Sequence, residues 1–192
     1  MNLMPFDELN TLHEIVARVM DKPKGEREQF RDWLMDEVLD ILILSYVYGN
    51  KDGNEGLASD VGIDRDALDE SVYKRINGEN WGDRIGAYFE NGTADEIYRV
   101  VETDSHRIYN DAVMNVGEAE NAKAHDGIIA KQWVTMRDDR VRDTHDYLEG
   151  MTIPLNDRFY TYDGDSARYP GDFEDPANNV NCRCGIRLTK LA

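Results

Sequence analysis

The chain has 192 residues, of which 39 are acidic and 22 basic, so its formal net charge at pH 7 is −17. This charge argues against broad binding to nucleic acid, because phosphate contacts need clustered Lys and Arg side chains. The first 150 residues hold 33 of the acids and 17 of the bases. The 10 Tyr, 5 Phe and 3 Trp residues exclude a disordered acidic chain. The length is sufficient for a buried core in one domain or two small ones.

The sequence predicts no membrane partner and a reducing compartment. Its most apolar run, residues 38–48, is interrupted by Asp40 and Ser45 and is shorter than the roughly 20 residues that a spanning helix requires. The N-terminal segment lacks the basic and apolar regions of a secretory signal. The two cysteines, Cys182 and Cys184, do not amount to a disulfide framework.

Two stretches near the N-terminus have apolar residues at helical spacing. The first is amphipathic and carries Leu12, Ile15, Val16 and Val19 on one face. The second, residues 26–48, is expected to be the central buried helix. Its apolar positions are Phe30, Trp33, Leu34, Val38, Ile41, Leu42 and Leu44. Residues 49–62 are rich in Gly, Asn and Asp, which is typical of a connector.

Three further helices are predicted before residue 125. Asp64 is a candidate N-cap for a helix that ends at Gly78, and another short helix covers residues 81–92. Thr93 and Glu96 have the spacing of a capping box and open a long helix that ends around residue 124. The apolar stripe of this helix consists of Ile97, Val101, Ile108, Ala112 and Val116.

The pattern changes in the C-terminal part. Residues 131–136 are β-branched and aromatic, which indicates a strand, and residues 140–148 return to helical spacing. Residues 151–181 are rich in Pro, Gly, Asp and Asn and predict a long loop. Alternation of apolar and polar residues then predicts a half-buried strand, with one face formed by Cys182, Cys184, Ile186 and Leu188.

These patterns predict an α+β fold. A helical region over residues 1–125 is expected to pack with a small C-terminal α/β module over residues 126–192 that contains a short sheet. The two parts should form one folded unit, because only a short connector joins the long helix to the first strand. Trp133 is expected to anchor the core of the module.

His145, Cys182 and Cys184 are the candidate metal ligands, because imidazole nitrogen and thiolate sulfur bind zinc. An acidic residue of the preceding segment could supply a fourth ligand: Asp138, Asp139 or Asp143. The single residue between the cysteines is shorter than the spacer of ordinary zinc knuckles. The sequence therefore favours two buried thiols without a cofactor, with a zinc site as the alternative. In either case His145 is expected to lie near both cysteines.

Residues 138–145 also contain carboxylates and a histidine that could act as acid and base. Structural ion pairing is favoured, because acids suit a helix start and Arg140 and Arg142 can neutralise them. The remaining histidines are expected to be solvated or satisfied on helix surfaces: His13, His106 and His125. The sequence contains no Gly-rich phosphate loop, nucleophile elbow or His-Glu-x-x-His motif.

A set of motifs in the C-terminal half resembles the Mu-F-like phage head morphogenesis (minor head protein) family over about residues 75–188. The C-terminal motif residues are Trp133, Asp139, Arg142, His145, Gly150, Tyr169-Pro170-Gly171-Asp172 and Asn181-Cys182-Arg183-Cys184. The upstream ones are Asn77-Gly78, Trp81, Asp83-Arg84-Ile85 and the helix through Glu102-Thr103-Asp104. The last triplet departs from the family's usual Arg-Thr-Glu.

The resemblance implies a minor head protein of a tailed phage or prophage. Such a protein joins the procapsid, associates with the portal protein and other capsid or scaffold proteins, and assists DNA packaging or delivery. Its location would be the host cytoplasm during assembly and then the interior of the virion head. The resemblance brings no established catalysis and no catalytic residue. The alternative is a small metal-dependent hydrolase or nuclease that uses His145, Cys182 and Cys184.

Overall fold

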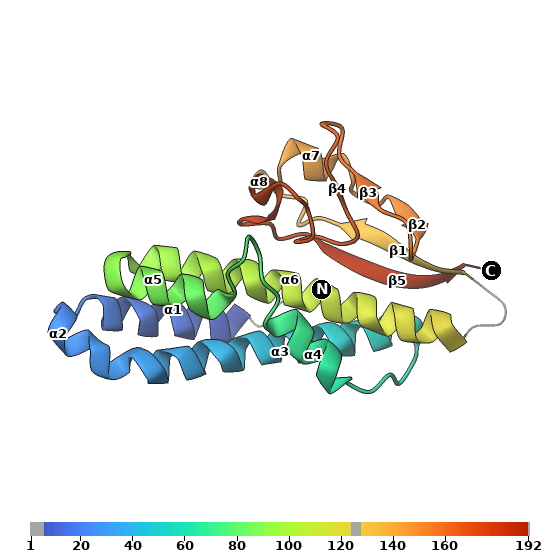
Figure 1. Ribbon diagram of the computed structural model, residues 1–192. Helices are drawn as coiled ribbons and strands as arrows, with labels where there is room; N and C mark the ends of the chain where they lie inside the picture. Colours follow the sequence, from blue (N-terminus) through green and yellow to red (C-terminus); the bar gives the residue numbers. More distant parts are fainter. Residues whose placement is uncertain (1–5, 124–127, 192) are drawn as a thin grey trace.

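The computed structural model describes residues 6–123 and 128–191 and has an α+β fold (Figure 1). The helices are α1 (Phe6–Met20), α2 (Lys24–Arg27), α3 (Arg31–Leu57), α4 (Arg65–Val72), α5 (Trp81–Asn91), α6 (Ala94–Lys123), α7 (Asp143–Asp146) and α8 (Pro176–Asn179), with a 3₁₀ helix η1 (Glu28–Phe30). The strands are β1 (Ile128–Val134), β2 (Thr152–Pro154), β3 (Phe159–Tyr160), β4 (Ser166–Ala167) and β5 (Gly185–Leu191). The predicted fold class is confirmed.

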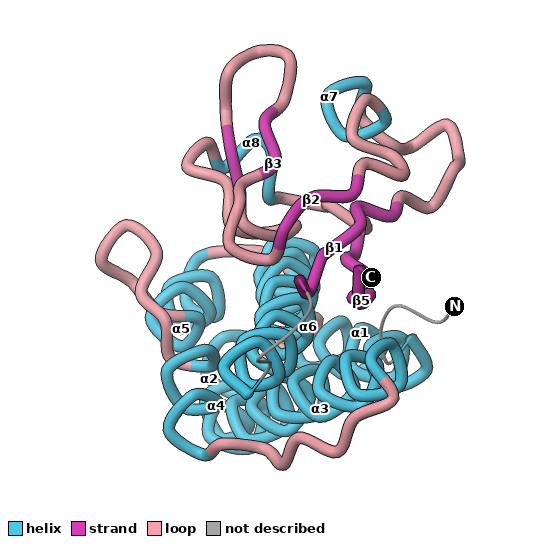
Figure 2. The backbone as a smooth tube through the Cα atoms, turned by 90° about the vertical axis from the view of Figure 1, so that its right-hand side faces the viewer, coloured by secondary structure: helices cyan, strands magenta, loops and turns pink. Residues whose placement is uncertain are grey.

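The long helices α3 and α6 run side by side and form the centre of a helical layer (Figure 1). The C-terminal strands lie on one side of this layer, next to α6 (Figure 2). Buried residues of both parts belong to one hydrophobic core. The predicted boundary at residue 125 falls outside the described residues, so the division into 1–125 and 126–192 stays a prediction.

Helix α3 extends through the segment that was expected to be a connector. Its glycines face α6: a Cβ at Gly49 would overlap the carbonyl oxygen of Tyr109, and a Cβ at Gly53 would lie 3.0 Å from Cβ of Val116. Glycine here permits close helix packing rather than a turn. The helix ends at Ala58, which has a left-handed φ of 49°. Only residues 58–64 connect α3 to α4.

Other helix predictions are confirmed at their starts and corrected at their ends. Asp64 caps α4 by accepting bonds from the N–H groups of Asp66 and Ala67, but α4 ends at Val72 and not at Gly78. Thr93 and Glu96 form the expected capping box at the start of α6. Trp33 is one of the apolar positions of the predicted central helix, but its side chain is 42% exposed.

The C-terminal part contains more regular structure than the sequence pattern indicated. The predicted loop 151–181 holds β2, β3, β4 and α8, and the predicted helix 140–148 is reduced to the single turn α7. The predicted strand 131–136 is β1 and lies at 128–134. The last strand begins at Gly185, so both cysteines precede it. Short strands were missed because they offer too few residues for a periodic pattern.

Strand β1 is the centre of an antiparallel sheet with the order β2-β1-β5, and β3 and β4 form a separate hairpin. Trp133 pairs with Ile186 and Lys131 pairs with Leu188, so these four side chains share one face of the sheet. Leu188 on this face approaches Gly56 of α3 and Gly117 of α6. The sheet therefore packs through its inner face onto both long helices.

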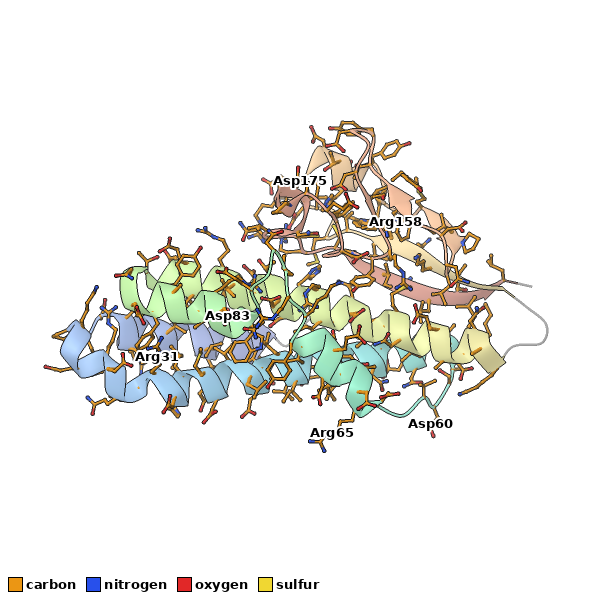
Figure 3. All side chains as sticks on the ribbon, in the orientation of Figure 1. Arg31, Asp60, Arg65, Asp83, Arg158 and Asp175 are labelled. Atoms are coloured by element: carbon orange, nitrogen blue, oxygen red, sulfur yellow. The ribbon has the colours of Figure 1, made fainter. Side chains whose placement is uncertain are left out.

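Among the described residues, no helix is long and apolar enough to cross a membrane. Charged side chains cover the outer surfaces, with Arg31 and Asp83 on the helical layer and Arg158 and Asp175 on the C-terminal part (Figure 3).

The contact between α3 and α6 predicts a large effect of adding one methyl group. Gly49→Ala should destabilise the protein by about 1–3 kcal/mol, because its Cβ would overlap the Tyr109 carbonyl. Gly25→Ala is the control, because a Cβ there meets nothing within 4 Å. Urea denaturation measures both. A Gly49→Ala protein as stable as the Gly25→Ala protein would contradict the proposed role of Gly49.

Candidate functional site

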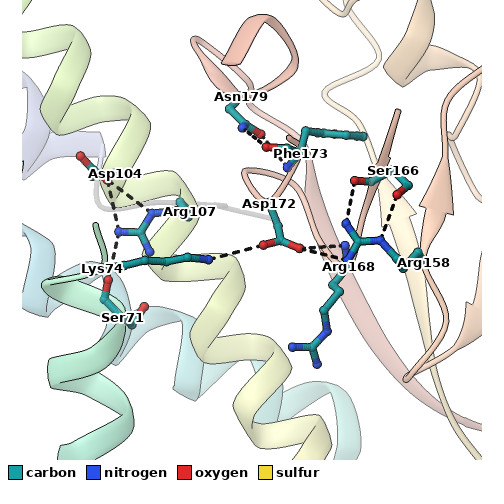
Figure 4. Close-up of polar contacts among 10 residues, drawn as sticks. All are labelled: Ser71, Lys74, Asp104, Arg107, Arg158, Ser166, Arg168, Asp172, Phe173 and Asn179. Carbon is teal, nitrogen blue, oxygen red and sulfur yellow. Dashed lines mark hydrogen bonds and ion pairs between the residues drawn. The ribbon is translucent and has the colours of Figure 1, made fainter. Parts of the chain in front are cut away.

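A buried ion network joins the upstream motif residues to the long helix α6. The Asp104 carboxylate is 1% exposed and accepts bonds from the Arg84 guanidinium at 2.5 Å and from Arg107 at 3.2 Å. Arg107 also donates to the carbonyl oxygen of Ser71 at 3.0 Å (Figure 4). A buried carboxylate requires such partners, because desolvation penalises its charge. The triplet Glu102-Thr103-Asp104, which differs from the family's usual Arg-Thr-Glu, therefore keeps a structural carboxylate at its third position.

The Tyr169-Pro170-Gly171-Asp172 loop docks directly on this network. Gly171 has a φ of +97°, and a Cβ on it would lie 3.0 Å from Cα of Arg107. Only glycine satisfies both the left-handed backbone and the close approach. The next residue, Asp172, accepts bonds from Lys74 at 3.4 Å and from the backbone N–H of Arg168 at 3.1 Å (Figure 4). The loop motif thus fixes the C-terminal part to α6 and to the segment after α4.

Two arginines of the motif hold the segments around the cysteines. Arg183 donates to both carboxylate oxygens of Asp138, at 2.6 and 2.8 Å. The hydrogen bond from Arg183 lowers the pKa of Asp138 to about 2. Arg142 donates to the carbonyl oxygen of Val180. These contacts connect the turn before α7 to the segment that leads into β5.

His145 lies between the two cysteines, as the sequence predicted. Its Nδ1 atom is 3.5 Å from Sγ of Cys182 and 3.5 Å from Sγ of Cys184. All three side chains are buried, and their possible ligand atoms lie within 4.8 Å of one another. Turn α7 presents the imidazole, and the segment before β5 presents the sulfurs. The part of the chain that the structure describes adds no carboxylate to this group: Asp138 faces Arg183, and Asp139 and Asp143 are exposed.

Aromatic rings surround this His145–cysteine cluster. The imidazole stacks on Phe173, with ring centroids 5.2 Å apart, and meets the Trp133 indole edge-on at 5.5 Å. Trp133 is fully buried and also contacts the ring of Phe159. The predicted core role of Trp133 is confirmed, although its partners come from the 159–173 segment as well as from α7.

The two thiols differ in their acidity. The Cys184 thiol donates a hydrogen bond to the sulfur of Cys182, and this bond, with help from His145, holds the pKa of Cys182 well below its usual range. The same bond and burial raise the pKa of Cys184. Both thiols lie in a buried, aromatic environment.

The other histidines differ in their solvent exposure. His13 is exposed, as predicted, and its ring lies 4.4 Å from that of Tyr98. His106 is only 2% exposed, so its assignment to a helix surface is wrong. Burial lowers the pKa of His106. His125 lies outside the described residues.

Two buried polar positions near the site were missed by sequence reasoning. Asn110 is fully buried on α6; it accepts a bond from the backbone N–H of Ile186 and donates to the carbonyl oxygen of Cys184. Lys131 is fully buried, with its Nζ 5.5 Å from the centroid of the Phe159 ring, and burial lowers its pKa to about 8. Sequence reasoning had no local signal for Asn110, because its partners lie 74 and 76 residues further along the chain.

A family model described as "Phage Mu protein F like protein" matches residues 63–187. The chain belongs to this phage head family. The match includes the ion network, the Tyr169–Asp172 loop and the His145–cysteine cluster. Membership indicates a phage head-related, virion-associated protein. The resemblance predicted from the motifs is confirmed.

One curated relative is the NAD(+)–arginine ADP-ribosyltransferase EFV of Enterococcus faecalis (strain ATCC 700802 / V583). It is 27% identical over 133 residues, which cover 62% of this chain and 26% of the relative. The chain thus spans about a quarter of that protein's length. No solved structure matches the chain.

The burial of Trp133 predicts a strong dependence of stability on this side chain. Trp133→Ala should reduce the free energy of unfolding by about 3–5 kcal/mol, because it leaves a cavity among His145, Phe159 and Phe173. Trp33→Ala provides the matched control, because Trp33 is 42% exposed. Guanidinium denaturation measures both. A loss below about 1 kcal/mol for Trp133→Ala would contradict the assignment.

The ion network predicts a comparable effect without loss of volume. Asp104→Asn should destabilise the protein by about 3–5 kcal/mol, because Arg107 would remain buried without its carboxylate. Asp95→Asn serves as the control, because the Asp95 side chain is 85% exposed. Thermal and urea unfolding compare the two proteins. Equal stabilities would show that the buried ion pair contributes nothing.

Proposed function

We propose that this protein is a minor head protein that associates with the portal protein and assists procapsid assembly and DNA packaging or delivery. The observation that carries this proposal is the match to the phage head family over residues 63–187. Other capsid or scaffold proteins are further partners within the same assembly. The protein acts in the host cytoplasm during assembly and is then carried inside the head.

The acidic face of α3 is the proposed portal contact. Asp32, Asp36 and Asp40 are exposed at successive helical turns, and Trp33 is 42% exposed beside them. Charge at the edge of an interface steers association and sets specificity, while an aromatic side chain supplies the anchor. The expected partner surface is basic, with an apolar pocket for the indole.

We propose that the protein assists DNA packaging or delivery through its contact with the portal protein and not by binding DNA itself. A net charge of −17 repels phosphate, so direct DNA binding would need a local basic surface. The family match supports a role in the phage head, and the negative net charge of the chain favours a protein partner there over DNA.

The hydrolase or nuclease alternative finds no comparable support. The His145–cysteine cluster opens onto a cavity of only about 10 Å³. Clefts of about 570 and 550 Å³ are lined by other residues, so the candidate ligands and a substrate-sized space do not coincide. The activity in the name of the Enterococcus relative belongs to a protein of which this chain matches 26%.

Co-expression with the portal protein from the same gene neighbourhood tests the proposal. The two proteins should co-purify, and the variant Asp36→Lys/Asp40→Lys should bind at least about tenfold more weakly, because like charges would then face each other. Asp60→Lys/Asp69→Lys makes the same change in charge on exposed residues outside α3. Binding is measured by surface plasmon resonance at two salt concentrations.

If the unmodified protein does not bind the portal protein, the proposed portal partner is wrong. Equal binding by the two charge variants would retain the portal partner and remove α3 as the contact.

A further inference from the structure

We propose that His145, Cys182 and Cys184 bind a zinc ion that has a structural role. This inference does not depend on the portal contact, because it concerns ligands in the core of the C-terminal part. The distances carry the argument: Nδ1 of His145 is 3.5 Å from each sulfur. With Zn–S and Zn–N bonds of about 2.3 and 2.0–2.1 Å at tetrahedral angles, a nitrogen and a sulfur ligand lie about 3.5 Å apart.

The charges of the three ligands also suit a divalent ion. Two thiolates, one neutral imidazole and Zn²⁺ sum to zero, and a buried centre is stable when its charge is compensated. His145 is 1% exposed and the cysteines are 4% and 3% exposed, so the thiol protons of this cluster are shielded from solvent. Zinc binding releases these protons to solvent and replaces weak thiol hydrogen bonds by metal–ligand bonds.

The ligands are held in position before any ion arrives. Phe173 stacks on the imidazole with an angle of 18° between the rings. The backbone N–H of Cys182 donates to the carbonyl oxygen of Asn179 at 3.1 Å, and Asn181 has a left-handed φ of 56°. This fixed backbone directs both sulfurs toward His145. Binding would therefore require little rearrangement.

A small cavity beside the ligands indicates what kind of site this is. Its volume is about 10 Å³, and its lining includes Arg140, Arg142 and Asn181 together with the three ligands. This space accommodates one ion or one water molecule and no organic substrate. The described residues place three ligands in the group, so a water molecule would take the fourth position. Three protein ligands with an open fourth position is the ligand count of catalytic zinc sites. Because the cavity admits no organic substrate, we assign the ion the role of holding the turn α7 to the segment before β5.

Metal analysis of the purified full-length chain tests the proposal. Protein expressed in zinc-supplemented medium without a polyhistidine tag should contain one equivalent of zinc by mass spectrometry of the metal. After removal of the zinc by a chelator, titration with Co²⁺ should produce a sulfur-to-cobalt charge-transfer band and the visible spectrum of a tetrahedral site. Folded protein that contains no zinc and binds no Co²⁺ would overturn the proposal.

Ligand variants identify the site. Cys182→Ser, Cys184→Ser and His145→Asn should each weaken Co²⁺ binding by more than about 100-fold, since even loss of an outer-shell partner costs 10–100-fold. The charge-transfer band should fall by about half in each cysteine variant, because one of two thiolates is lost. His13→Asn is the control, because His13 is an exposed histidine of α1 outside the ligand group.

If a variant fails to fold, the spectrum of the unmodified chain still tests the proposal. The intensity of its charge-transfer band reports the number of thiolate ligands, which should be two. Retention of the full spectrum in a folded Cys182→Ser/Cys184→Ser protein would place the metal elsewhere and overturn the proposal. A failed portal interaction alongside a normal cobalt spectrum would affect only the proposed function.

Discussion

The structure depends on the close contact that α6 makes on two sides at once. Tyr109 lies against α3, where only a glycine at position 49 leaves room for its carbonyl oxygen. The next residue, Asn110, bonds the backbone on either side of Gly185, where β5 begins. Because consecutive residues face opposite partners, the helix–helix distance and the position of the sheet are set by the same turn of α6.

This arrangement explains why motifs far apart in the sequence occur together. Arg84 from α5 forms an ion pair with the buried Asp104 of α6, and Gly171 allows the Tyr169–Asp172 loop to approach the neighbouring Arg107. Arg183 pairs with Asp138 across the segments that carry the cluster. These motif residues therefore connect secondary-structure elements to one another, and none of these contacts requires a substrate.

The sequence predicted elements well where local chemistry decides the structure. Asp64 and the Thr93–Glu96 box identified helix starts, because capping depends on neighbouring residues. Gly49 and Gly53 were misinterpreted as connector residues, since close packing against α6 leaves no local signal. Trp133 and the meeting of His145 with the cysteines were predicted from residue type and alternation.

What the sequence could not supply is the environment of polar residues. His106 and Asn110 lie one helical turn apart on α6 and both are buried, and Asn110 bonds the backbone of Cys184 and Ile186 from the distant C-terminal part. Asp104 fell on the apolar stripe between Val101 and Ile108, and a charge at a core position does indicate a buried partner. Its partners, Arg84 and Arg107, became identifiable only when the α5–α6 packing was known.

The His145–cysteine cluster occupies a position from which it can influence the whole molecule. The carbonyl oxygen of Cys184 accepts a bond from Asn110, so one residue of this cluster also connects the sheet to the helices. Asn110 links this cluster to α6, and α6 in turn packs along α3. A small buried centre can thus determine how rigidly the C-terminal part holds the acidic helical layer.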